Sequence, residues 1–175
     1  MSGHSKWSTI KRQKGATDAK RGAVFTKLAN AITIAVRQNQ GVANATERAR
    51  AANMPKENIQ RAIDRGLGKG EGAILTEAIY EGFGPSGTAI IVETISDNNT
   101  RTANELRNIF HKHNGHLGVP GSVSYLFSRV GYNIFQPKPE TMITISDPAQ
   151  LEKVHNLLNA IDELDDVQEV YTNLN

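Results

Sequence analysis

The stretch Gly82–Gly87 has the spacing G-x-G-x-x-G, which holds a pyrophosphate in dinucleotide-binding proteins. That chemistry requires the loop to open a helix, because the helix N-terminus supplies the backbone N–H groups that bind the phosphate. The residues that follow, 88–92, are mostly β-branched and predict a strand instead. We therefore expect a tight turn between two strands and no nucleotide site. A close approach of this glycine-rich tip to an RNA backbone stays a hypothesis.

Three histidines, His111, His113 and His116, carry side chains that bind metals. Residues two apart on a helix diverge by about 200°, so His111 and His113 would not face the same ion. The chain has no cysteine, and the acidic residues at 162–166 lack the ligand spacing of a calcium loop. No serine lies in a nucleophile-elbow sequence. The sequence therefore predicts no metal site, no cofactor, no catalytic residue and no enzyme.

A third group of residues, near the N-terminus, has the chemistry of polyanion binding. Lysine and arginine gain binding free energy by displacing counterions from phosphates, and an exposed tryptophan can stack on a base or a ribose. Two alternatives stay open: the cations could form a solvated tail, and Trp7 could instead anchor the arm to the helices that follow. The candidate nucleic-acid-binding residues are Lys6, Trp7, Lys11, Arg12, Lys14, Lys20, Arg21 and Lys27.

The charge of the chain is divided unevenly along its length. Residues 1–75 contain 14 Lys and Arg against 5 Asp and Glu, whereas residues 76–175 contain 6 against 13. A nucleic acid would therefore be attracted by the first part and repelled by the second, which predicts two domains with different partners. The apolar runs are too short to cross a membrane, and the N-terminus lacks the apolar stretch of a secretory signal. We expect a cytoplasmic protein with no membrane partner.

The first part of the chain has the apolar periodicity of helices. After a basic arm over residues 1–16, we expect helices over residues 17–39, 44–52 and 55–66, which together form a small bundle over residues 17–68. Gly41 would end the first helix, Asn44 and Glu47 would form a capping box, and Pro55 would occupy the first position of the third helix. A flexible linker follows over residues 69–75.

The second part, residues 76–175, alternates strands and helices. We expect strands over residues 77–81 and 88–95, a helix over 100–114, a strand over 122–129 that continues at 133–135, and a strand over 142–145. A helix over 148–161, capped by Asp147, and a strand over 167–172 complete the pattern. This order predicts an α+β chain whose second domain is a ferredoxin-like split βαβ (βαββαβ) fold with an extra leading strand.

Four segments of the chain, which together cover most of it, resemble the YebC/PmpR family. They are GHSKW with DAKRG and FTKL near the start, NMPKENIQRAIDRG at 53–66, YEGFGPSGTAIIVE at 80–93, and LDDVQEVYTN at 164–173. The resemblance implies a DNA-binding transcriptional regulator, or a translational activator like the mitochondrial member. Typical members carry a third domain inserted where this chain has only a short linker, between 135 and 142. We favour a compact member over a sequence that lacks residues at this point.

These observations favour a non-enzymatic regulator of gene expression that binds ribosomal RNA and acts on translation as a monomer bound to the ribosome. No helix-turn-helix with a base-reading second helix and no dimer element for palindromic sites stands out, and basic arms that fold on binding are common on structured RNA. A regulator that binds duplex DNA is the alternative, and a protein-interaction module is the third interpretation. An RNA-recognition domain ranks low, because residues 122–129 lack its Lys/Arg-Gly-aromatic motif.

Overall fold

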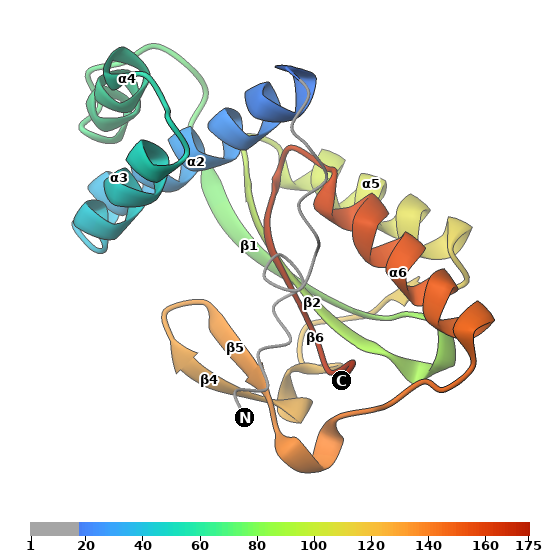
Figure 1. The fold of residues 1–175 in the computed structure, drawn as a ribbon. Helices are drawn as coiled ribbons and strands as arrows, with labels where there is room; N and C mark the ends of the chain where they lie inside the picture. The colour runs from blue at the N-terminus through green and yellow to red at the C-terminus, as the bar shows by residue number, and fades with distance from the viewer. Residues whose placement is uncertain (1–17) are drawn as a thin grey trace. The chain divides into compact units, whose positions relative to one another are not determined.

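The computed structural model describes residues 18–175, which form two compact units (Figure 1). The helical unit comprises residues 18–76 and 95–98, and the sheet unit comprises residues 77–94 and 99–175. The fold is α+β, with helices first and a region of the βαβ type after them, as the sequence predicted. The arm expected over residues 1–16 lies outside the described residues.

Three helices form the helical unit: α2 (Asp18–Gln38), α3 (Val42–Ala51) and α4 (Lys56–Gly66). Gly41 has a φ of 70° between α2 and α3, a conformation that glycine adopts without strain. The predicted capping box is wrong, since α3 begins at Val42 and its N-cap, Gly41, makes no side-chain cap bond. The carbonyl of Gly41 already accepts the N–H of Ala45 at 3.0 Å, so the helix starts directly after the turn. Pro55 lies one position before α4 rather than inside it.

A small apolar core holds the three helices together. Its buried members are Ile32, Ala49, Met54, Ile59 and Ala62, with Phe25 and Leu28 among the half-buried residues that pack against them. The hydroxyl of Thr33 on α2 donates to the carbonyl of Ala62 on α4 at 3.1 Å, which joins the two helices inside the unit.

The helices α2 and α4 are in close contact at Gly66. A Cβ atom at Gly66 would lie 2.6 Å from the Cβ of Val36 and 2.7 Å from the carbonyl oxygen of Thr33. Only glycine fits this contact without a shift of one helix.

A second, smaller core in the helical unit includes a segment from far along the chain. Ile34 of α2 and Leu75 pack with Ile95, all three nearly fully buried. The hydroxyl of Thr76 also donates to the carbonyl of Ser96 at 3.3 Å. Residues 95–98 therefore belong to the helical unit, although residues 95 and 96 end a strand that begins in the sheet unit.

The sheet unit contains a four-stranded sheet in the order β3-β1-β2-β6. The strands are β1 (Thr76–Phe83), β2 (Ala89–Ser96), β3 (His116–Leu117) and β6 (Val167–Thr172). Two helices, α5 (Asn99–Lys112) and α6 (Pro148–Asp162), cover one face of the sheet (Figure 1). The main core lies between them and the sheet and includes Ile90, Val92, Phe110 and Leu157. Asp147 caps α6 as predicted, since its carboxylate accepts the N–H of Ala149 at 3.0 Å.

The opposite face of the sheet is covered by a hairpin, which the sequence did not predict. Its strands, β4 (Phe127–Gly131) and β5 (Ile134–Pro137), form a separate two-stranded sheet, and Phe127 packs on Ile91 and Tyr171. The strand predicted over residues 122–129 therefore begins only at Phe127. The strand predicted over 142–145 is reduced to one bridge, Ile143 with Leu174, and the leading strand β1 occupies a central place between β2 and β3.

A buried carboxylate explains why the chain leaves the sheet before the hairpin. Glu81, on the face of β1 opposite the helices, is only 7% exposed and accepts backbone N–H groups of Gly121, Val123 and Ser124 at 2.7–2.8 Å. These bonds hold residues 121–124 as a loop. Apolar alternation suggested a strand here, yet Tyr125 is 63% exposed.

Candidate nucleic-acid interface

The structure describes the side chains of only two of the predicted binding residues, Arg21 and Lys27. Both lie on α2, six residues apart, so their side chains point about 120° apart around the helix axis. Arg21 is exposed and Lys27 is half-buried, and the two do not form one binding face. Lys20 lies in the first turn of α2. The remaining predicted residues, Lys6, Trp7, Lys11, Arg12 and Lys14, lie outside the described residues.

Exposed cations on α3 and α4 add to the positive charge of the helical unit, and they were not among the binding residues predicted from the sequence. They are Arg48, Arg50, Lys56 and Arg61. Arg48 and Arg50 lie in the last turn of α3, where the helix dipole also favours positive charge. The charge count of residues 1–75 contained this signal, but the count alone does not tell which cations are exposed.

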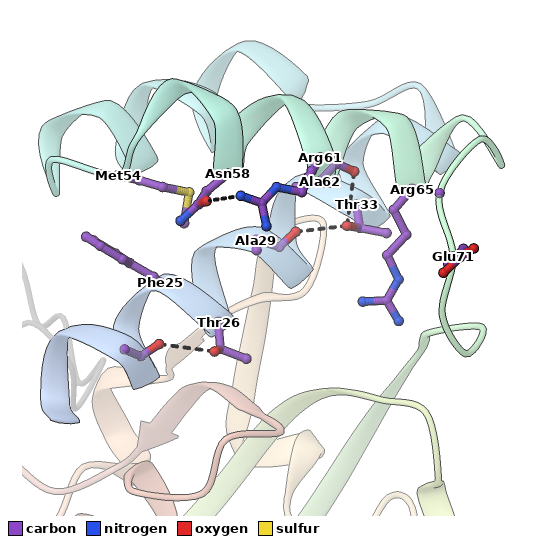
Figure 2. A pocket seen from close by; sticks show the side chains of 12 residues that line it. Phe25, Thr26, Ala29, Thr33, Met54, Asn58, Arg61, Ala62, Arg65 and Glu71 are labelled. Atoms are coloured by element: carbon purple, nitrogen blue, oxygen red, sulfur yellow. Dashed lines mark hydrogen bonds between the residues drawn. The ribbon is translucent and has the colours of Figure 1, made fainter.

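A groove of about 700 Å³ lies between α2 and α4, within the helical unit (Figure 2). Phe25, Thr26 and Ala29 line it from α2, while Met54, Asn58 and Arg61 line it from the opposite side. Its walls therefore combine apolar groups with hydrogen-bonding ones. The two helices are close where Thr33 meets Ala62, and the groove occupies the space beside this contact.

Two arginines border the groove and differ in what they contact. The guanidinium of Arg61 is exposed and donates to the side-chain oxygen of Asn58 at 3.1 Å, which orients it along the rim (Figure 2). Arg65 donates instead to the carbonyl of Ala73 at 2.7 Å, in the segment that also carries Glu71. Because this bond fixes Arg65 to the segment after α4, the linker predicted there is tied to the helix. Arg61 is thus the cation presented to a ligand.

The glycine motif has a structural role in the described residues. Gly82–Gly87 joins β1 to β2 through a tight turn, with the N–H of Gly84 donating to the carbonyl of Thr88 at 2.8 Å and Gly87 at a φ of 73°. Within residues 18–175, no group of three or more His, Asp or Glu is placed to hold a metal ion. None of the helices in this range is both long and apolar enough to pass through a membrane.

The buried carboxylate of Glu81 is also structural. Burial acts to raise its pKa, but the hydrogen bonds from Gly121, Val123 and Ser124 outweigh this effect and hold the pKa below the ordinary value. Glu81 is therefore an ionised anchor for the loop at residues 121–124.

Comparisons with known proteins place the two units in one family. Residues 5–69 match the model of the TACO1/YebC protein N-terminal domain, and residues 75–140 and 134–174 match that of the TACO1/YebC second and third domain. A probable transcriptional regulatory protein of Ralstonia nicotianae is 39% identical over 239 aligned positions, covering 99% of this chain and 98% of the relative. A conserved hypothetical protein of Aquifex aeolicus has a similar crystal structure, with a TM-score of 0.82 and 34% identity over 97% of this chain and 96% of that one.

Other relatives are matched over part of their length. A probable transcriptional regulatory protein of Rubrobacter xylanophilus is 57% identical over 139 residues, which cover 75% of this chain and 56% of the relative. The match thus spans little more than half of that protein.

Proposed function

This chain belongs to the TACO1/YebC family, and we propose that it is a non-enzymatic regulator of gene expression that binds structured RNA. In this proposal the basic arm of residues 1–16 and the helical bundle of residues 17–68 bind the RNA of the ribosome. The protein acts on translation, as a monomer in the cytoplasm. The acidic sheet unit serves as a spacer or contacts a protein.

The exposed cations of the helical unit are the observation that carries this proposal. Arg48, Arg50, Lys56 and Arg61 are all exposed on α3 and α4, in the part of the chain where positive charge dominates. Phosphates are attracted to such a surface whatever the base sequence, and each neutralised phosphate contributes to affinity through counterion release.

RNA is the favoured target because neither short helix has the surface of a base-reading element. Arg48 and Arg50 are two residues apart and diverge by about 200° around α3. On α4, Gln60 donates to Asp64 at 3.0 Å, so polar groups on its outer side bond to each other. A recognition helix in the major groove of DNA instead carries several polar side chains that reach base edges.

A DNA-binding transcriptional regulator is the second candidate. The names of the Ralstonia and Rubrobacter relatives, probable transcriptional regulatory proteins, favour it. The cations described above would bind the phosphates of DNA as well as those of RNA. The two candidates are therefore distinguished by letting DNA compete with RNA for the protein.

The test is co-sedimentation with ribosomes over a series of salt concentrations, with duplex DNA as competitor. Replacing Lys11, Arg12 and Lys14 with Glu should weaken binding at least about tenfold and reduce the salt dependence, since each lost phosphate contact lowers the slope by roughly 0.7 to 0.9. A matched variant of the sheet unit, with Arg107, Lys112 and Lys153 changed to Glu, should bind like the wild type. Equal effects of the two variants would contradict the proposal. Displacement by DNA at equal phosphate concentration would favour the transcriptional candidate.

A further inference from the structure

We propose that the groove between α2 and α4 binds one unpaired nucleotide of the RNA, with the base against the ring of Phe25 and the phosphate at Arg61. This inference rests on the proposed function and specifies what the helical unit recognises: a bulged or looped-out nucleotide rather than a continuous duplex.

The walls of the groove suit a nucleobase. Phe25 on α2 is half-buried, so part of its ring reaches the groove, and Met54 opposite it is nearly fully buried. Bases stack on aromatic rings with little dependence on sequence, and the buried side chain of Met54 closes the groove on the opposite side. Figure 2 shows the two side chains at the same end of the groove, on opposite sides of it.

The hydrogen-bonding groups suit the remainder of a nucleotide. Arg61 is exposed, and its bond to the oxygen of Asn58 at 3.1 Å aims the guanidinium along the rim. The amide nitrogen of Asn58 is a donor for the edge of a base, because the amide oxygen accepts from Arg61. At the other end of the groove, Arg65 is bonded to Ala73 and the carboxylate of Glu71 repels phosphate. These charges set the direction of the nucleotide, with its phosphate toward Arg61.

The size of the groove selects an unpaired nucleotide. Its volume of about 700 Å³ lies in the range of pockets that hold single small molecules. A base inside a duplex must first break its pairing and stacking, which costs a few kcal/mol, whereas a bulged base costs least. The groove therefore discriminates between RNA shapes without reading a sequence.

The experiment compares two RNA hairpins that differ by a single bulged adenosine, titrated against the full chain by fluorescence anisotropy. The wild type should bind the bulged hairpin about fivefold or more tightly than the fully paired one, the lower end of the range for base–aromatic stacking. Phe25→Leu keeps an apolar side chain against the core but loses the aromatic ring, and Arg61→Gln loses the charge. Phe25→Leu should reduce the preference toward equal affinity while leaving the fully paired hairpin bound within about twofold. Arg61→Gln also removes a general phosphate contact, so it should weaken binding of both hairpins and reduce the preference for the bulged one.

Matched control positions lie on α2, outside the groove. Val24→Leu, at an exposed position next to Phe25, and Arg37→Gln, in the last turn of α2, should keep the preference for the bulge. A hairpin with 2-aminopurine at the bulge gives an independent signal: its fluorescence should change on binding to the wild type and not to Phe25→Leu. Far-UV circular dichroism identifies any variant that fails to fold, and Arg61→Gln then carries the test.

The outcomes separate this inference from the proposed function. Equal affinity of the wild type for both hairpins would overturn the groove proposal and leave RNA binding intact. An undiminished preference in both Phe25→Leu and Arg61→Gln would overturn it as well. Loss of binding to both hairpins and to ribosomes would overturn the proposed function together with the groove.

Discussion

The two units of this chain use charged side chains in opposite ways. The sheet unit buries Glu81 and satisfies it with three backbone N–H groups, so that the charge holds a loop in place. The helical unit keeps Arg50, Lys56 and Arg61 exposed around a small apolar core that contains no charged side chain. A buried and satisfied charge stabilises a fold, whereas an exposed one contributes little to stability and is available to a ligand. Whether a charged side chain is buried or exposed therefore says more about its role in this chain than the sign of its charge does.

The helices of the helical unit depend instead on close contact. The carbonyl of Thr33 and the Cβ of Val36 lie where a side chain of residue 66 would begin. A unit with so small a core is stabilised by the fit between α2 and α4, and it is sensitive to volume rather than to charge. Four predictions test this difference, from the largest expected effect on stability to the smallest.

The largest effect is expected for Glu81→Gln in the sheet unit. One carboxylate oxygen of Glu81 accepts from Gly121 and the other from Val123 and Ser124, so an amide would turn an N–H donor toward at least one of these N–H groups. The free energy of unfolding should fall by about 3 kcal/mol. Hydrogen exchange of peptides that contain residues 118–126 should increase, while that of α2 should not. The exposed Glu140→Gln should have little effect, and equal effects of both variants would contradict a structural role for Glu81.

Gly66→Ala should destabilise the helical unit by about 2 kcal/mol, because the added methyl group overlaps Val36 and the backbone of Thr33. Faster hydrogen exchange confined to peptides of α2 and α4 would show this. Gly22→Ala is the matched control on α2, since nothing lies within 4 Å of its added Cβ. Alanine is the better helix former, so this control should stabilise by about 0.5 to 1 kcal/mol. If Gly66→Ala left the free energy of unfolding unchanged, the two helices would not be held by close contact at this position.

Acid should weaken the sheet unit through Glu81. Its pKa in the folded protein lies below the ordinary value of 4.5, so its contribution to stability is complete above that pH and is lost as the pH falls through the folded pKa. Urea unfolding at pH 7, 5 and 3 should therefore show a difference in stability between the wild type and Glu81→Gln that is the same at pH 7 and 5 and smaller at pH 3. A difference between them that stays constant from pH 7 to pH 3 would show that ionisation of Glu81 does not matter.

The smallest effect on stability is expected for Arg61→Gln in the helical unit. Arg61 is exposed, and the hydrogen bond described above joins it to Asn58 on the same helix. Its replacement should change the free energy of unfolding by less than about 0.5 kcal/mol, as is usual for exposed positions. Urea unfolding of this variant beside the wild type measures it. A loss similar to that of Glu81→Gln would remove the contrast between the two units.

The sequence was sufficient for features that depend on neighbours along the chain. Apolar periodicity located the three helices of the helical unit, and the Asp147 cap and the positive φ of Gly41 follow from residue type and position. Gly66 was predicted correctly as the end of α4, but its close contact with Val36, thirty residues earlier, was not. Such contacts leave no trace in local periodicity.

Long-range contacts also account for what the sequence could not supply about the sheet and the site. Glu81 is forty residues from Gly121, so alternating apolar residues at 123–127 predicted a strand where the carboxylate holds a loop. The groove combines Phe25 with Asn58, from two helices whose packing the sequence does not reveal. The arm residues Lys6, Trp7, Lys11, Arg12 and Lys14 stay predictions, because they lie outside the described residues.

The small core of Ile34, Leu75 and Ile95 determines where this chain can be cut into separate fragments. Because residues 95–98 complete the helical unit, no single cut in the gene separates one unit from the other. A fragment that ends at residue 76 would leave Ile34 and Leu75 without the side chain that covers them, and exposed apolar groups of this kind promote aggregation. A continuous piece of sequence that carried only the three helices would lack Ile95.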